Sequence, residues 1–248
     1  EKIRFKHIFV KNPTAHFNNK QNENIENFQF TDKACTETPS APSIPKRLLK
    51  YLNINLRDAT KSKLDALVKL HPDVSFFLLN ELNMHSEHAA VICSTGYKIC
   101  YSTPDINKKS YAAIMYKQQL EQNVKQIPCP PMFCKILFRD KNYKLTITSV
   151  YRANDSSIKY KYSNYSKSKF YEDIGTLSRE GNSVRSIIAG DFNIPLLGDP
   201  NTKLTQLKTQ LMGYRNLVKK STFQKIYRKN SKIYESAIDG VFIKNVDH

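Results

Sequence analysis

The chain has 248 residues, of which 39 are Lys or Arg and 22 are Asp or Glu, so its formal net charge is +17. Hydrophobic residues make up 40% of the sequence. This is enough for one large folded domain, and no apolar run is long enough to cross a membrane. The electrostatic field of a positively charged protein attracts polyanions, of which nucleic acid is the commonest and an anionic membrane surface the second. The composition therefore excludes a membrane-spanning protein and favours one that binds nucleic acid.

The cysteines argue against a zinc site and against a disulfide framework. Their number is odd, no two of them form a CxxC pair, and their spacing is too wide for tetrahedral zinc. They are Cys35, Cys93, Cys100, Cys129 and Cys134. We expect reduced thiols in an intracellular protein.

Residues 1–45 differ from the rest of the chain. They are rich in Asn and end in a stretch with three prolines, TETPSAPSIP, which is typical of a poorly ordered polar tail and linker. The opening KIRFKHIFV has the composition of a single strand. From residue 46 onward, apolar periodicity predicts a folded domain over residues 46–248.

Strands and helices alternate through this domain, with hairpins mixed in. Strands are predicted at residues 47–56, 73–81, 111–116, 133–139, 143–151, 186–190 and 236–243. Helices are predicted at residues 61–70, 169–179 and 202–212. Because a hairpin joins residues 133–139 to 143–151, the pattern favours an α/β sandwich with mixed sheets over a doubly wound parallel sheet.

Polar side chains gather at the ends of the predicted strands. They are Asn53, Asn55, Glu81, Tyr151, Arg152, Asn154, Asp191, Asn193, Asp239, Asp247 and His248. Each alone is an ordinary turn, cap or solvated residue. Together they indicate a site, because ligands bind where the strands of such sheets end.

The most specific stretch is SIIAGDFNIPLLG, residues 186–198. Here a buried strand is expected to end at Gly190, which turns the chain. Asp191 and Asn193 would then lie on the same side of an extended segment.

The order of these residues resembles the endonuclease/exonuclease/phosphatase superfamily. The motifs are Asn55 in LNINL, Glu81 in LLNEL, Tyr151 in SVYRAND, Asp191 and Asn193 in GDFN, Asp239 in AIDGVF, and Asp247–His248 in VDH. The resemblance spans residues 47–248 and implies a DNase I-like fold, a four-layer α/β sandwich with two mixed sheets flanked by helices. Within the superfamily, SVYRAND and STFQKIYRKNSKIYESAIDGVF are similar to blocks in the apurinic-type endonuclease domain of non-LTR (LINE-type) retrotransposons.

Three features depart from the family pattern. Val246 stands where the final motif usually has Ser, and Tyr111 in YAAI stands where Gly is common near the site. The chain also ends at His248, whereas in the family a further strand follows that residue. On this comparison we expect the domain to be cut short at its carboxyl end.

The resemblance implies phosphodiester hydrolysis assisted by Mg²⁺, with Mn²⁺ as a substitute. Glu81, Asn55 and Asp247 are the expected metal site, since carboxylate and amide oxygens suit Mg²⁺. Asp191 is the expected general base for the attacking water. The expected donors to the phosphate are Asn193, Tyr151 and His248, and Asp239 is expected to orient His248.

Double-stranded DNA is the expected substrate. Lysines alternate with tyrosines in KYKYSNYSKSKFY, and a second basic run precedes the last strand, where LINE-type enzymes carry a hairpin that influences target choice. The predicted contacts are Arg152, Asn154, Lys159, Lys161, Tyr162, Thr222, Lys225 and Arg228. The alternative for the first segment is a solvated loop that leads into a helix.

Four functions remain open on the sequence. The first is a nickase that makes a 3′-hydroxyl primer for reverse transcription, acting in the nucleus with a reverse-transcriptase domain in the same polyprotein. The second is a repair endonuclease for abasic sites, against which the lack of Trp and the LINE-like blocks count. The third is a phosphatase or lipid phosphodiesterase, although no amphipathic membrane anchor is visible. The fourth is a DNA-binding domain that has lost catalysis.

Overall fold

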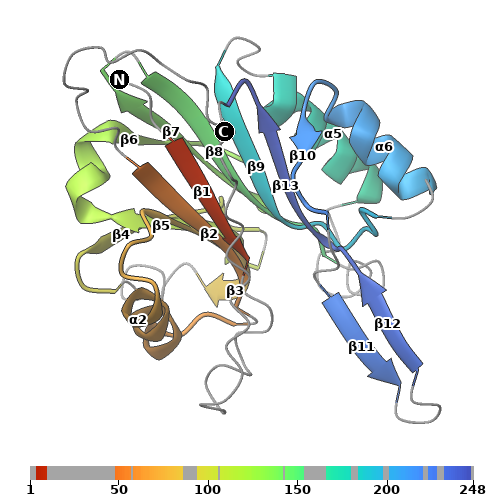
Figure 1. The fold of residues 1–248 in the computed structure, drawn as a ribbon, viewed down its shortest axis with the longest axis horizontal. Helices are drawn as coiled ribbons and strands as arrows, with labels where there is room; N and C mark the ends of the chain where they lie inside the picture. The colour runs from red at the N-terminus through yellow and green to blue at the C-terminus, as the bar shows by residue number, and fades with distance from the viewer. Residues whose placement is uncertain are drawn as a thin grey trace, which may run out of the picture.

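The computed structural model describes residues 4–9, 48–56, 58–85, 94–105, 107–141, 143–153, 166–179, 184–197, 201–219, 223–227 and 232–246. Two mixed β-sheets lie face to face in this part of the chain (Figure 1). The first sheet has the order β1 (Arg4–Phe9), β2 (Leu48–Asn55), β3 (Phe76–His85), β5 (Lys109–Lys117) and β4 (Tyr97–Tyr101). The second has the order β10 (Arg215–Asn216), β13 (Asp239–Lys244), β9 (Arg185–Asp191), β8 (Tyr143–Tyr151), β7 (Phe133–Asp140) and β6 (Val124–Ile127).

Helices cover the outer faces of both sheets (Figure 1). Helix α2 (Lys61–Leu70) lies on the first sheet, and α5 (Lys167–Arg179) and α6 (Thr202–Gln210) lie on the second. A 3₁₀ helix, η1 (Gln118–Asn123), leads into β6. The two sheets and the helices outside each of them make the four layers of the α/β sandwich that the sequence predicted.

The two-residue period of the strands builds the layers of the first sheet. On β3, Phe76 and Leu78 lie in the core between the sheets, whereas Phe77 and Leu79 pack with Leu64 of α2. Alternate side chains of a strand point to opposite faces, so one continuous apolar run can serve two cores.

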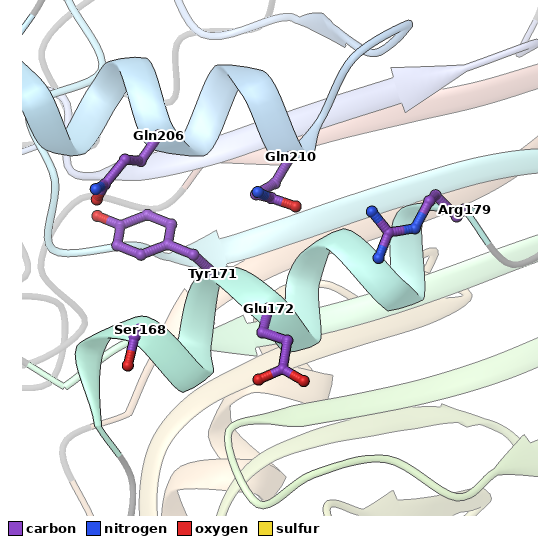
Figure 2. Close-up of a pocket in the computed structure, with 6 residues that line it drawn as sticks. All are labelled: Ser168, Tyr171, Glu172, Arg179, Gln206 and Gln210. Atoms are coloured by element: carbon purple, nitrogen blue, oxygen red, sulfur yellow. The ribbon is translucent and has the colours of Figure 1, made fainter.

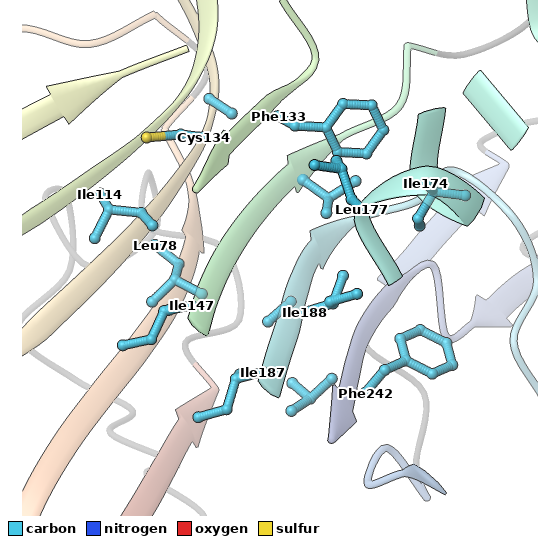
Figure 3. Close-up of a cluster of buried hydrophobic side chains, with 14 of the residues drawn as sticks. Leu78, Ile114, Phe133, Cys134, Ile147, Ile174, Leu177, Ile187, Ile188 and Phe242 are labelled. Carbon is cyan, nitrogen blue, oxygen red and sulfur yellow. The ribbon is translucent and has the colours of Figure 1, made fainter. Parts of the chain in front are cut away.

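The second sheet follows the same rule. Figure 3 shows Ile147 and Ile187 on the side of the first sheet, and Ile188 on the side of Ile174 and Leu177 of α5. The face of β9 that carries Ile187 therefore points into the sandwich. Asp191, four residues further along the same strand, belongs to that face.

A strand from the amino end joins the first sheet. The strand predicted within residues 2–10 is β1, which pairs in parallel with β2 in the register Arg4 to Leu48 through Phe9 to Asn53. Residues 10–45, the rest of the predicted tail, lie outside the described residues.

All the strands and helices predicted for the domain are present, with shifts of a few residues at their ends. The sequence analysis missed β4, β6 and β10. These are short edge strands. β6 and β10 have no buried side chain, so no buried apolar pattern marks them, whereas β4 buries Tyr97 and Cys100.

The role assigned to Gly190 was wrong. The strand continues through Asp191, and Gly190 lies inside it rather than at a turn. A Cβ atom on Gly190 would lie 1.9 Å from the carbonyl oxygen of Val150. Glycine is therefore needed here because β8 and β9 approach closely, not because the chain turns.

Three cysteines have the predicted state. Cys100, Cys129 and Cys134 are buried free thiols, and burial raises the pKa of the Cys134 thiol well above its usual value. Cys35 and Cys93 lie outside the described residues. Over the described ranges, no helix is long and apolar enough to span a membrane.

We predict that Gly190→Ala lowers the free energy of unfolding by about 3 kcal/mol, since the methyl group forces two paired strands apart. Gly96→Ala is the control: Gly96 has φ +80° with open space around its Cα, so the change costs only about 1–2 kcal/mol. Urea denaturation of both variants measures the difference. Equal losses would contradict the close-approach explanation.

Candidate active site

Strand register brings three predicted residues into one row of the second sheet. Asp191 pairs with Tyr151 on the parallel strand β8 and with Asp239 on the antiparallel strand β13. Paired residues point to the same face, so all three side chains belong to the inner face at one rim of the sandwich. Because β13 runs antiparallel to β9, it is the start of β13 that meets the end of β9, which explains why Asp239 begins its strand.

The first sheet contributes a second row at the same rim. Asn55 at the end of β2 pairs with Asn80 on β3. The register between β3 and β5 then shifts between Asn80 and Met84, and within this bulge Glu81 and Asn83 have positive φ angles of 54° and 48°. Bulges re-aim side chains next to active sites, and this one sets the direction of Glu81.

A hydrogen bond joins the two rows across the sandwich. The Asn55 side-chain Nδ2 donates to Asp191 Oδ2 at 3.0 Å. The amide therefore holds the carboxylate in one orientation and connects the end of β2 in one sheet to the end of β9 in the other.

A buried polar network lies beneath this contact. The fully buried Asn80 donates through Nδ2 to Asn53 Oδ1 at 2.8 Å. Ser149 Oγ on β8 lies 3.0 Å from Asn80 Oδ1 and 3.1 Å from the carbonyl oxygen of Leu79, and can donate to either. The sequence analysis missed Asn80 and Ser149 as structural parts of the site. The available signal was a polar residue at an inward position of an otherwise apolar strand.

Burial and neighbouring acids raise the pKa of Asp191 well above its usual value. Loss of solvation is the largest cause and the negative charge of Asp239 is the next, with a smaller contribution from Glu81. Hydrogen bonds from the Asn193 backbone and from Asn55 act in the opposite direction. The charges of Asp239 and Glu81 thus disfavour the charged form of Asp191, and a carboxylate with a raised pKa is a stronger proton acceptor.

Asn193 is placed close to Asp191, but not as predicted. Its backbone has φ +47°, so the segment is not extended. Its amide N–H donates to Asp191 Oδ1 at 2.9 Å, and its side-chain Nδ2 donates to the Arg152 carbonyl oxygen at 2.6 Å. Asn193 thus binds the carboxylate through its backbone and fixes the neighbouring loop through its side chain.

The structure revises the prediction that Arg152 contacts DNA. The side chain is only 1% exposed, its guanidinium lies 5.8 Å from the ring centre of Phe170, and Nη1 donates to the Asn193 carbonyl oxygen at 3.4 Å. A guanidinium buried in this way is not at the surface to meet a phosphate. Arg152 instead joins α5 to the loop that carries Asn193.

Tyr151 packs against the residue that departs from the family pattern. Its ring is stacked on Tyr111, with ring centres 6.3 Å apart and an angle of 25° between the rings. The Tyr111 hydroxyl donates to Asp105 Oδ2 at 2.8 Å. The sequence analysis placed Tyr111 near the site, and the structure gives it a definite contact there, whereas Asp105 was missed.

The remaining predicted residues are not in the described part of the chain. They are Asp247, His248, Asn154, Lys159, Lys161, Tyr162, Thr222 and Arg228. The backbone of Lys225 is described in β11 (Phe223–Tyr227), which forms a hairpin with β12 (Lys232–Ser236). Figure 1 shows this hairpin projecting beyond the two sheets, from the rim where β13 begins.

The donors at the rim fit a hard divalent cation. Glu81, Asp191 and Asp239 interact electrostatically, and the Asn55 amide lies beside them, so negative charge and oxygen ligands are concentrated there. Among the described residues, no group of three or more His, Cys, Asp or Glu side chains lies together in a way that could hold a metal ion.

The helical face carries a separate groove. It has a volume of about 430 Å³ and lies between α5 and α6 (Figure 2), lined by Ser168, Tyr171, Glu172, Arg179, Gln206 and Gln210. None of the predicted site residues lines it. The predicted site residues that are described lie at the rim of the sandwich and not in this groove.

Comparison with solved structures supports the same fold. The endonuclease domain of TRAS1, a telomere-specific non-LTR retrotransposon, is 21% identical with a TM-score of 0.60, covering 79% of this chain and 84% of that one. An endonuclease/exonuclease/phosphatase family protein from Leptotrichia buccalis is 14% identical with a TM-score of 0.55, covering 79% and 88%. The AP endonuclease LMAP from Leishmania major is 10% identical with a TM-score of 0.53, covering 79% and 78%.

These likenesses establish the fold. The chain has the architecture shared by the endonuclease/exonuclease/phosphatase proteins. The predicted DNase I-like fold is confirmed, and the likeness to a non-LTR retrotransposon endonuclease domain is a likeness of fold. No protein-family model matches the sequence, and no curated protein does either.

We predict that Asn80→Ala lowers the free energy of unfolding by about 2 kcal/mol or more, because buried partners on Asn53 and Ser149 lose a hydrogen bond. Asn123→Ala is the matched control. The Asn123 Nδ2 also donates to a carbonyl, that of Arg139, but at an exposed position, so its loss costs about 0.5 kcal/mol. Chemical denaturation of the two variants compares them, and similar losses would refute a stabilising network between the sheets.

Proposed function

We propose that this protein is a metal-dependent endonuclease that nicks double-stranded DNA by hydrolysing a phosphodiester bond. The observation that carries the proposal is the convergence of Asn55, Glu81 and Asp239 on the buried Asp191 at one rim of the fold. A net charge of +17 suits a polyanionic substrate. The nuclease fold of the TRAS1 domain and of the AP endonuclease LMAP is consistent with this activity.

Asp191 is the proposed general base. Two donors, the Asn193 backbone N–H and the Asn55 amide, orient its carboxylate. It removes a proton from a water molecule, whose oxygen attacks the phosphorus. The bond between phosphorus and O3′ breaks, and the leaving oxygen takes up a proton to give a 3′-hydroxyl and a 5′-phosphate.

The other residues serve the phosphate and the cation. Glu81 and Asn55 would hold Mg²⁺ or Mn²⁺ together with Asp247, and the ion would offset negative charge on the phosphate and the leaving oxygen. Asn193, Tyr151 and His248 are proposed donors to the phosphate oxygens. Asp239 is proposed to favour the charged form of His248.

We predict that Asp191→Asn slows nicking of supercoiled plasmid by at least about 10²-fold, because the amide cannot accept the water proton. Gel separation of supercoiled and open-circular plasmid over time measures the rate, and EDTA should abolish it. Asp140→Asn is the matched control, since Asp140 lies at the β7–β8 turn, at the opposite end of β8 from Tyr151. Nicking by Asp191→Asn at the parent rate would remove Asp191 from the mechanism.

The biological role proposed for the cut is to supply a 3′-hydroxyl primer for reverse transcription of a non-LTR retrotransposon. This assigns it a reverse-transcriptase domain in the same polyprotein and a nuclear place of action. The structural likeness to the TRAS1 domain and the hairpin formed by β11 and β12 beside the site favour this role over repair.

An abasic-site substrate separates the two roles. We predict that a duplex with one abasic analogue is cut no more than about threefold faster than the intact duplex, because a nickase that makes a primer acts on intact DNA and gains nothing from a damaged nucleotide that leaves the stack easily. Labelled duplexes of the same sequence give both rates. A strong preference for the abasic duplex would reverse the assignment in favour of repair.

A further inference from the structure

The rim of the first sheet contains an unusual concentration of left-handed backbone. Asp58, Glu81 and Asn83 have φ angles of 74°, 54° and 48°. This conformation is disfavoured for residues with a Cβ atom, so it persists where surrounding contacts impose it. Glu81 is one of these three residues and is the proposed metal ligand.

Hydrogen bonds tie the Glu81 bulge to the segment that follows β2. The backbone N–H of Asp58 donates to the Glu81 carbonyl oxygen at 3.0 Å, and that of Ala59 donates to the Leu82 carbonyl oxygen at 3.1 Å. The Asn83 side chain adds a bond from Nδ2 to Asp58 Oδ1 at 2.8 Å. The position of the bulge therefore depends on the position of Asp58.

One side chain of α2 holds that segment in turn. The ammonium group of Lys63 donates to the carbonyl oxygens of Leu56 at 2.9 Å and Asp58 at 2.8 Å. Lys63 is itself fixed at the start of the helix, where its backbone N–H donates to the capping Thr60 hydroxyl at 3.3 Å. Charged donors make strong hydrogen bonds, and two carbonyl acceptors define the place of the ammonium group.

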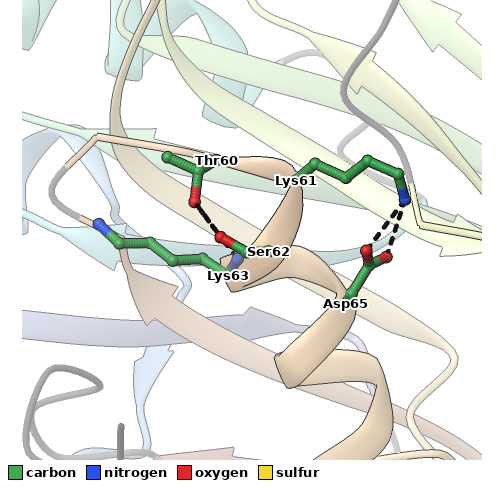
Figure 4. A network of polar contacts seen from close by, with 5 residues as sticks. All are labelled: Thr60, Lys61, Ser62, Lys63 and Asp65. Carbon is green, nitrogen blue, oxygen red and sulfur yellow. Dashed lines mark hydrogen bonds and ion pairs between the residues drawn. The ribbon is translucent and has the colours of Figure 1, made fainter.

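The neighbouring lysine on the same helix behaves differently. Figure 4 shows Lys61 paired with Asp65 and Lys63 extending to the other side of the helix. The Lys61–Asp65 pair, at 2.9 Å, joins two residues of α2. Of these two lysines, Lys63 is the one whose ammonium group binds the segment after β2.

We propose that Lys63 is a positioning residue for Glu81. Its ammonium group fixes the Leu56 and Asp58 carbonyls, the fixed segment imposes the bulge of β3, and the bulge aims the Glu81 carboxylate at the cation. The inference rests on the proposed function, because it takes Glu81 as a metal ligand. Loss of an outer contact of this kind weakens metal binding by about 10- to 100-fold.

Binding of Mn²⁺ to the DNA-free protein tests the proposal by titration calorimetry. We expect Lys63→Met to raise the Kd for Mn²⁺ by at least about tenfold, and Lys61→Met, the matched control, to leave it unchanged. Lys63→Arg should recover most of the affinity, since it keeps a charged donor. Nicking by Lys63→Met should approach the parent rate when the Mg²⁺ concentration is raised, because the defect lies in binding the cation.

Three other results would contradict the proposal or the metal assignment on which it rests. If Lys63→Met lowers thermal stability but binds Mn²⁺ like the parent, its role is structural and the proposal fails. If Lys63→Met does not fold, Asn83→Ala removes the neighbouring bond to Asp58 and should weaken Mn²⁺ binding in the same direction; an unchanged Kd would overturn the proposal. Glu81→Gln tests the assignment of Glu81 as a metal ligand separately from the role of Lys63. Unaltered Mn²⁺ binding in that variant refutes the metal assignment itself.

Discussion

The hydrogen bond from Asn55 to Asp191 is the contact on which the candidate site depends, because it joins the two sheets where the chemistry is gathered. Asn55 ends a strand of the first sheet and Asp191 ends a strand of the second. Beneath it, the Asn80 network fixes the same two sheets through Asn53 and Ser149. A site assembled from two sheets keeps its geometry only if the sheets cannot slide, and buried hydrogen bonds oppose sliding because apolar contacts alone have little direction.

This arrangement is electrostatically unfavourable for the Asp191 carboxylate. Burial and two neighbouring acids disfavour its charged form, and two hydrogen-bond donors only partly offset this effect. Such a cluster destabilises a fold that had no use for it, so its presence at a rim argues for a function. A bound cation would offset this cost, since it would reduce the repulsion among the acids.

The sequence allowed the fold class and the main acids to be predicted, because both follow from local patterns. Apolar periodicity places Asn55, Glu81 and Asp191 at the ends of predicted strands and Asp239 within the last one, and the family resemblance singles them out. The errors concern contacts between distant segments. Nothing near Arg152 in the sequence reveals that α5 will cover it, and nothing near Gly190 reveals that Val150 will approach within contact distance. The left-handed angles of Glu81 and Asn83 were equally invisible, since neither is a glycine.

The backbone beside the site and the projecting hairpin differ in how they are held in place. Four of the seven described non-glycine residues with positive φ lie beside the site, namely Asp58, Glu81 and Asn83 at the rim of the first sheet and Asn193 beside the second. Each of these residues is held by hydrogen bonds within the sandwich, so the catalytic groups are aimed by the folded body. Among the described strands, in contrast, β11 and β12 pair only with each other, and their hairpin extends from the rim where Asp239 begins β13. Under the proposed function, substitutions in the hairpin are expected to alter DNA binding without displacing the residues around Asp191.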